Sequence, residues 1–228
     1  MITIRNEKLR RGLQVLIPFL LIPAATAAGI FVFHEKRYAF VSLVITLLAL
    51  LLFVCGFERK KTGTRRLVLT AVMTALSVAG RFIPLFKPIS ALTILTGMYL
   101  GSEAGFLAGA LSAVISNFYF GQGPWTPFQM FAWGLIGLIS GYLAAFLKKN
   151  RLRLLLFGVL TGAVFSFIMD IWTVLWYNGS FSLRLYWAAL GTALPYTLMY
   201  SLSNLIFLQL FAKPFGEKLQ RIRIKYGV

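Results

Sequence analysis

The sequence has little acidic charge and few residues that could bind a metal or form a disulfide. Six Asp and Glu residues stand against 23 Lys and Arg residues, and there is one cysteine and one histidine. With only Cys55, neither an internal disulfide nor a cysteine metal site can form. His34 lacks neighbouring histidines and carboxylates at metal-ligand spacing. We therefore predict no metal site and no cofactor bound by this chain.

Sequence motifs for catalysis and nucleotide binding are also missing. No Walker-type loop is present, so we do not expect the chain to hydrolyse ATP by itself. Gly121-Gln122-Gly123 lacks the strand and the further glycine of a dinucleotide-binding fingerprint. No candidate nucleophile is accompanied by a base and an orienting group in a pattern that would be unexpected by chance. The sequence therefore predicts a protein that is not an enzyme.

What the chain does have is a large apolar content. Of its 228 residues 59% are hydrophobic and 13% are charged, and the mean hydropathy is +0.80. Soluble domains of this size do not have such a composition, so we expect an all-α integral membrane protein. The net charge of +17 could suit nucleic acid. However, the basic residues form short clusters between apolar runs, where they indicate membrane topology, and we predict no nucleic-acid partner.

Six apolar runs have the length of one membrane crossing, about 20 residues. They are 13–33, 38–57, 67–84, 127–147, 154–176 and 185–212. The stretch 88–120 is too long for one crossing of a ~30 Å hydrocarbon core. Gly101-Ser102-Glu103 offers a break, which gives short helices at 90–100 and 104–119. The sequence therefore predicts about eight transmembrane helices.

Basic clusters define the orientation and the division of the chain. An even number of spans keeps most Lys and Arg residues on the inside, so both termini are predicted to be cytoplasmic and the 121–125 turn to face outward. The first two spans are rich in Leu, Val and Ala, whereas the later ones carry more glycine, aromatic and polar residues. We therefore divide the chain into two extra spans and a basic linker (1–63), a six-helix bundle (64–213) and a basic cytoplasmic tail (214–228).

Small residues recur every four positions in two stretches of the sequence. Gly97, Gly101, Gly105 and Gly109 form one set, and the other is Ala71, Ala75 and Ala79. This spacing lets helix backbones approach closely. The sets are explained either by packing within the bundle or by a docking face for a partner membrane protein.

Two charged residues are expected at similar depth in the outer half of the bundle. An unpaired carboxylate costs about 2.5 kcal/mol or more within a membrane, so Asp170 needs a partner. Arg81 could form an ion pair with it, or both could contact a ligand.

Aromatic and polar residues gather at the same outer level and suggest a cup for an aromatic solute. Thr126 is predicted to cap the following helix, with Pro127 at its first position and Gln129 completing a capping box. The candidate ligand contacts, besides Arg81 and Asp170, are Asn117, Trp125, Gln129, Trp133, Trp172, Asn178 and Tyr196.

The segments "LTAVMTALSVAGRFIP" and "LTGMYLGSEAGFLAGALSAVISNFYFGQGPWTPFQMFAWGLIGLISG" carry a family resemblance. From Arg66 to Phe211 the chain resembles the S component, the substrate-binding membrane subunit, of energy-coupling factor (ECF) vitamin transporters of prokaryotic plasma membranes. The resemblance implies capture of a vitamin-like molecule from outside, and uptake together with a transmembrane T subunit and two ATPase subunits that use the ATP. An alanine pattern, here Ala71 and Ala75, would help to dock the T subunit. The "GQGPWTPFQ" turn looks most like members associated with cobalamin or its precursors.

Two other functions fit the composition. A membrane enzyme acting on a lipid or isoprenoid would use Asp170 and Arg81 as site residues, although the paired acidic motifs for a metal and a diphosphate are absent. A membrane assembly or sensor protein that does not transport would use the glycine faces only to form a complex.

Overall fold

The computed structural model describes residues 6–31, 38–56, 63–84 and 86–226, and their regular structure is entirely helical. His34 and most of the basic linker lie outside the described residues. The expected all-α class is confirmed for the described chain. The helices are α1 (Glu7–Leu16), the π-helical η1 (Ile17–Leu21), α2 (Ile22–Phe31), α3 (Tyr38–Cys55), α4 (Gly63–Gly80), α5 (Ile89–Leu100), α6 (Ser102–Phe120), α7 (Thr126–Tyr142), α8 (Ala144–Lys148), α9 (Arg151–Asn178) and α10 (Leu183–Tyr226).

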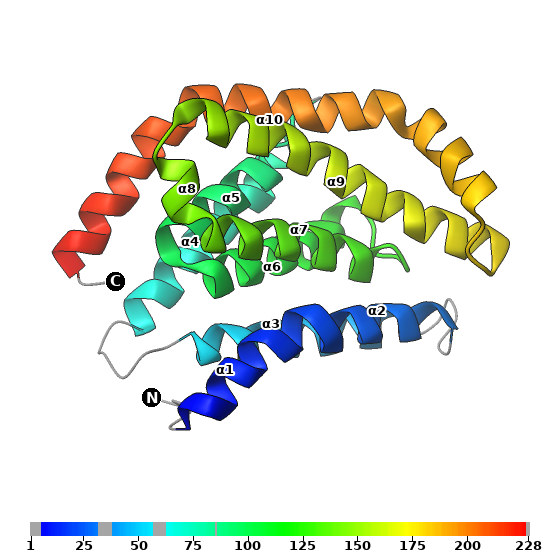
Figure 1. Cartoon of the computed structure of the whole chain (residues 1–228), viewed down its shortest axis with the longest axis horizontal. Coiled ribbons are helices and arrows are strands. Elements are labelled where there is room, and N and C mark those ends of the chain that lie inside the picture. Colours follow the sequence, from blue (N-terminus) through cyan, green and yellow to red (C-terminus); the bar gives the residue numbers. More distant parts are fainter. Residues whose placement is uncertain (1–5, 32–37, 57–62, 85, 227–228) are drawn as a thin grey trace.

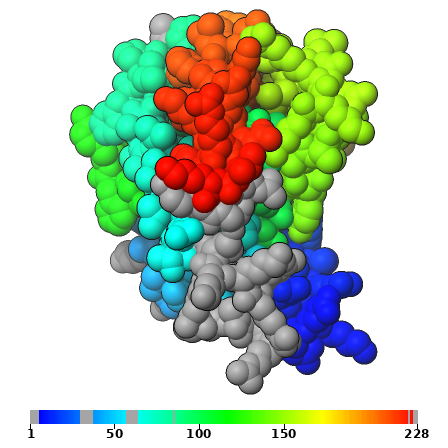
Figure 2. Space-filling view, turned by 90° about the vertical axis from the view of Figure 1, so that its left-hand side faces the viewer, coloured from blue at the N-terminus to red at the C-terminus, as the bar shows by residue number. Residues whose placement is uncertain are grey.

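The helices form three groups that lie over one another (Figure 1). The N-terminal helices α1 to α3 lie along one side, α4 to α8 form the middle, and α9 and α10 cover the other side. Both ends of the chain lie at the same end of the bundle, and the α6–α7 and α9–α10 turns lie at the opposite end. In Figure 2, the C-terminal part of α10 crosses the end of the bundle where the chain termini lie.

Glycines allow α6 and α7 to pack with their backbones in contact. A methyl group at Gly137 would overlap the backbone carbonyl of Gly105, and one at Gly109 would overlap the carbonyl of Trp133. Gly97 of α5 lies equally close to Gly137. Packing within the bundle therefore accounts for these three members of the glycine set. Around them, α5 is buried at almost every position.

The predicted break in the stretch 88–120 is confirmed at Gly101. Its φ of 104° is a conformation that side chains with a Cβ rarely adopt, and it ends α5 and begins α6. A methyl group there would also overlap the guanidinium of Arg66.

Three stretches of described helix are long and apolar enough to cross a membrane: Glu7–Gly29, Tyr38–Cys55 and Arg151–Asn178. Ile89–Leu100 is a shorter apolar helix. The helix α10 has 44 residues, about 66 Å at 1.5 Å per residue, and so exceeds a ~30 Å hydrocarbon core. It continues through the expected tail to Tyr226, and Figure 1 shows its C-terminal part bending over the bundle.

A polar junction joins the N-terminal helices to the rest of the bundle. Arg66, at the start of α4, donates to Glu103 Oε2 (3.1 Å) and to the carbonyls of Gly56 (3.0 Å) and Leu100 (2.5 Å). Gln14 of α1 donates to Glu103 Oε1 at 2.8 Å. The Arg66 and Glu103 side chains are only 13% and 12% exposed. Four helices, α1, α4, α5 and α6, thus meet at one largely buried ion pair.

Candidate functional site

The centre of the candidate site is a hydrogen-bond network around Asn117, near the C-terminal end of α6. Asn117 is fully buried, and its Nδ2 donates to Thr126 Oγ1 and Gln129 Oε1, each at 2.8 Å. Its Oδ1 accepts from Nη1 of Arg81, which follows α4. Arg81 Nη1 also donates to Ser116 Oγ at 2.6 Å. The network therefore fixes one side of the Arg81 guanidinium.

Of the two alternatives for Asp170 and Arg81, an ion pair or contact with a ligand, the structure contradicts the ion pair. Arg81 lies against α6, because α4 packs on α5 and α6, whereas Asp170 belongs to α9, which packs mainly on α7 and α10. Asp170 is 7% exposed, and its Oδ2 has no hydrogen-bond partner among the described residues. Equal depth in the membrane did not place the two side chains on facing helices.

The expected capping box at the start of α7 is also wrong. The N-cap position is Trp125, which makes no side-chain capping bond, and Thr126 is the first helical residue. Thr126 Oγ1 instead donates to Gln122 Oε1 (3.1 Å) and accepts from the Gly123 N–H (3.3 Å) as well as from Asn117. Gln129 likewise contacts Asn117. Both polar residues thus tie the turn to α6, and these tertiary hydrogen bonds replace the local cap.

A row of tryptophans connects the turn to α9. The ring of Trp125 packs edge-on against Trp172, with centroids 5.9 Å apart, and Trp172 stacks on Trp176 at 6.2 Å. A methyl group at Gly123 would overlap the Trp125 ring, so the glycine leaves room for the ring to fold over the turn. Trp125 and Trp172 are partly exposed, although the Trp172 Nε1 donor is buried without a partner.

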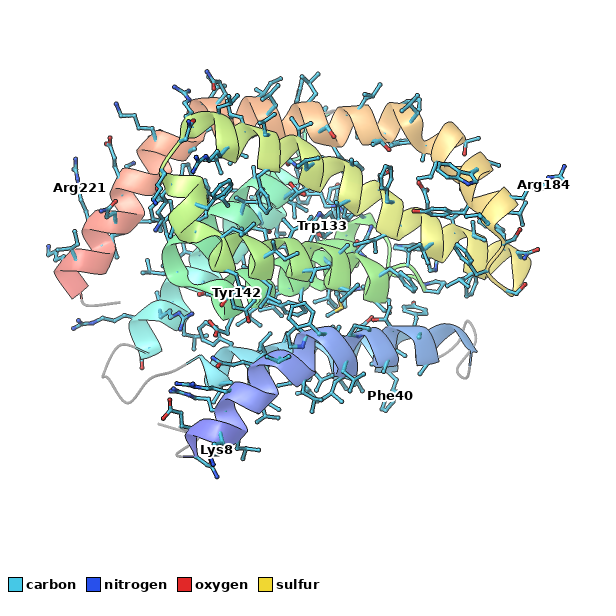
Figure 3. All side chains as sticks on the ribbon, viewed as in Figure 1. Lys8, Phe40, Trp133, Tyr142, Arg184 and Arg221 are labelled. Atoms are coloured by element: carbon cyan, nitrogen blue, oxygen red, sulfur yellow. The ribbon has the colours of Figure 1, made fainter. Side chains whose placement is uncertain are left out.

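A second aromatic group lies deeper, between α7 and α9, at the Trp133 label in Figure 3. Trp133 is 2% exposed and stacks on Phe165 with centroids 4.7 Å apart. Phe165 packs edge-on against Tyr200 of α10, and the Arg81 guanidinium lies 5.6 Å from the Trp133 ring. Among the described residues, the buried Nε1 donor of Trp133 has no acceptor. The group thus combines stacked rings with a donor that could bind an acceptor atom.

Asn178 and Tyr196 lie apart from this network. Asn178 is the exposed last residue of α9, and its side chain donates to Ser180 in the α9–α10 turn. Tyr196 is 63% exposed on α10. The structure does not bring them to the Asn117 network.

The alanine set lies on the outside of α4. Ala71, Ala75 and Ala79 are exposed, and Val68, Val72 and Leu76 beside them are exposed apolar residues. Packing within the chain therefore does not explain this set, in contrast to the glycines.

Sequence reasoning missed three residues beside Arg81. The Phe120 ring centroid lies 4.7 Å from the Arg81 guanidinium and 5.9 Å from Lys87 Nζ. Tyr200 lies near enough to interact electrostatically with Arg81. The "FYF" run after Asn117 was the available sequence signal, since it ends α6 at the same level as Arg81.

Comparison with known proteins identifies the family to which the chain belongs. The family model described as ECF-type riboflavin transporter, S component, matches residues 61–221. Neither a curated protein nor a solved structure matches the chain. The family match spans the Arg81, Asn117 and tryptophan positions described above and more than half of the chain. The expected membership among ECF S components is confirmed, and the chain belongs to the family of ECF-type riboflavin transporter S components.

Proposed function

We propose that this membrane protein captures a vitamin at the Asn117 network and the adjoining tryptophans, and moves it inward together with energising subunits. The observation that carries the proposal is the combination of stacked rings with unused donors. Trp133 and Trp172 each present a buried N–H that finds no acceptor in the described part of the chain, and both lie in aromatic packing. Buried donors normally have partners, so a ligand with acceptors on a flat ring would complete the site.

Membership in this family makes the chain a substrate-specific subunit of a vitamin transporter and not an enzyme. Family membership therefore argues against the alternative function of a membrane enzyme that acts on a lipid or isoprenoid. For the vitamin itself, the description of the family names riboflavin, whose flat ring carries several acceptors. The outer turn in the sequence points to cobalamin or a precursor. Both vitamins have a conjugated ring system that tryptophans can contact, so both belong in the test.

The proposed topology has eight spans in a prokaryotic plasma membrane, with both termini cytoplasmic. It is supported by the position of both chain ends at one end of the bundle (Figure 1). In Figure 3 the labelled basic residues Lys8 and Arg221 lie toward that end and Arg184 toward the other. The Asn117 network then lies toward the outside, where a vitamin arrives.

The proposed partners are a transmembrane T subunit and two ATPase subunits. The exposed strip formed by Ala71, Ala75 and Ala79 supports docking of a helix from the T subunit, because small residues permit close helix contact. ATP would be used by the partner subunits only, and this chain would hold no cofactor of its own.

Two measurements test the proposal. The first is mass spectrometry of small molecules released from the purified protein. The second is titration of the ligand-free protein with riboflavin, cobalamin and cobinamide, followed by tryptophan fluorescence. We expect one vitamin to bind tightly and to quench the fluorescence. A protein that releases nothing and binds none of a wider set of vitamins would favour the assembly or sensor function.

A further inference from the structure

Arg81 and Lys87 place two positive charges around one aromatic ring. Both lie over the same ring, Phe120, at 4.7 and 5.9 Å from its centroid. Both side chains are partly buried. Burial lowers the pKa of Lys87, and the neighbouring charge of Arg81 lowers it further. Two like charges that act on each other disfavour the arrangement, and an anion between them would compensate for this repulsion.

The described residues do not supply that compensation. Arg66–Glu103 and Arg11–Glu7 form ion pairs, whereas neither Arg81 nor Lys87 forms one within the described part of the chain. Only Nη1 of Arg81 makes hydrogen bonds within the described chain, so Nε and Nη2 remain available. The Trp133 ring lies 5.6 Å from the Arg81 guanidinium, and its Nε1, which has no partner among the described residues, is also a donor. Hydrogen-bond donors and positive charge therefore exceed acceptors around Phe120.

We propose that Arg81 and Lys87 form a subsite for an oxyanion, a phosphate or a carboxylate, at the outer end of the bundle. Arg81 is held in place by Asn117 and Ser116, so its free edge can bind two anion oxygens without a further loss of side-chain freedom. Lys87 adds a second charge from the segment before α5. The Phe120 ring, which both cations approach, also stabilises them in the absence of the anion.

The subsite extends the proposed vitamin site, and its role in capture rests on that proposal. The oxyanion could belong to the vitamin, such as the phosphate of a flavin nucleotide or the phosphodiester of cobalamin. It could also be the headgroup phosphate of an anionic lipid. The chemistry at Arg81 and Lys87 is the same in both cases, so the experiment must separate the sources.

The main variant is Lys87→Gln, because Lys87 makes no hydrogen bond to the residues that the structure describes. Arg81→Gln serves as a second variant, and Lys149→Gln, which changes an exposed lysine near the other end, is the matched control. The proteins are placed in phosphatidylcholine nanodiscs, and their Tm is measured in phosphate and in chloride at equal ionic strength. We expect phosphate to raise the Tm of the wild-type protein and of Lys149→Gln. Lys87→Gln should lose at least half of this rise.

Two further arms identify the source of the anion. For a vitamin phosphate, Lys87→Gln should weaken binding of flavin mononucleotide about fivefold and of riboflavin less than about twofold. For a lipid, phosphatidylglycerol nanodiscs should raise the Tm of the wild-type protein and not that of Lys87→Gln. Equal responses of wild type and Lys87→Gln in all three arms would overturn the subsite. If phosphate protects the wild-type protein but no vitamin binds, the subsite stands and the proposed function fails.

Discussion

Trp125 is the residue at which ligand binding and folding should separate most clearly. Its ring is partly exposed and contacts Trp172 across the gap between the turn and α9. Trp125→Ala removes a stacking surface but leaves the buried Asn117 network in place. We expect the vitamin affinity to fall about tenfold, or about 1.4 kcal/mol, with a smaller fractional effect on stability.

Titration calorimetry and thermal unfolding of the same preparations measure the two effects. Trp187→Ala is the control, because its ring is 66% exposed on α10 and lies outside the row of tryptophans. A large loss of stability with unchanged affinity would make the turn a purely structural connection.

For individual residues, the sequence predicted which ones take part in the candidate site better than it predicted which other residues they contact. Arg81, Asn117 and Gln129 were selected by their depth along the helices, and the structure joins them through Asn117. Depth does not determine the angle around a helix axis, so the Arg81–Asp170 ion pair, one of the two alternatives that depth allowed, does not form. The Thr126 and Gln129 cap failed because tertiary hydrogen bonds from Asn117 outweigh a local motif worth about 1 kcal/mol. Their contact with a ligand stays a prediction.

At the scale of the helices, the close contact of α6 with α7 should be the least tolerant part of the fold. Gly137→Leu would force the side chain into the carbonyl of Gly105 and separate the two backbones. We expect destabilisation by at least about 1–3 kcal/mol, measured by denaturant titration in micelles. The same substitution at Gly191, where nothing lies within 4 Å of an added Cβ, should be tolerated far better. Similar stability of the two variants would argue against backbone contact between α6 and α7.

A second prediction concerns the polar junction at which α1, α4, α5 and α6 meet. Glu103→Ala would leave Arg66 as an uncompensated, largely buried charge, so we expect a loss of about 3 kcal/mol. The matched control is Glu7→Ala, which breaks the exposed Arg11–Glu7 pair and should have little effect. Thermal unfolding of both variants provides the comparison. Equal effects would mean that the buried pair does not join the helices.

Helix boundaries were predictable from the sequence where a glycine or a turn ends the helix. They were less predictable where a cluster of charged residues was the only indication of a boundary. Gly101 separates α5 from α6 because its positive φ stops a helix. By contrast, the lysine and arginine cluster after residue 212 was expected to begin a tail, yet α10 continues through it to Tyr226. Basic residues indicate where a chain leaves the membrane, but Lys, Arg and Glu are good helix formers. The junction at Arg66 was not predicted, because it joins residues far apart in sequence.

At the scale of the whole molecule, one face of the bundle is covered by the extra N-terminal helices, whereas the alanine face of α4 is not. The N-terminal helices α1 to α3 cover α6 and α7, and their residues Ile17, Ile22, Ile45 and Leu52 are completely buried. These helices lie outside the matched range of the family model, which begins at residue 61. The alanine face of α4 remains uncovered. The extra helices therefore leave the proposed docking face free for a partner.

This arrangement predicts that docking and vitamin binding can be separated by substitution on α4. Ala75→Leu places a larger side chain in the middle of the exposed alanine strip, about two helical turns from the Asn117 network. We expect reduced co-purification of the T subunit and reduced vitamin uptake by cells that express all subunits, because close helix approach is blocked. Vitamin binding by the isolated variant should be unchanged. The control is Ala188→Leu, an exposed alanine on α10 that should retain both assembly and uptake. If Ala75→Leu assembles and transports normally, the T subunit must dock on another face of the bundle.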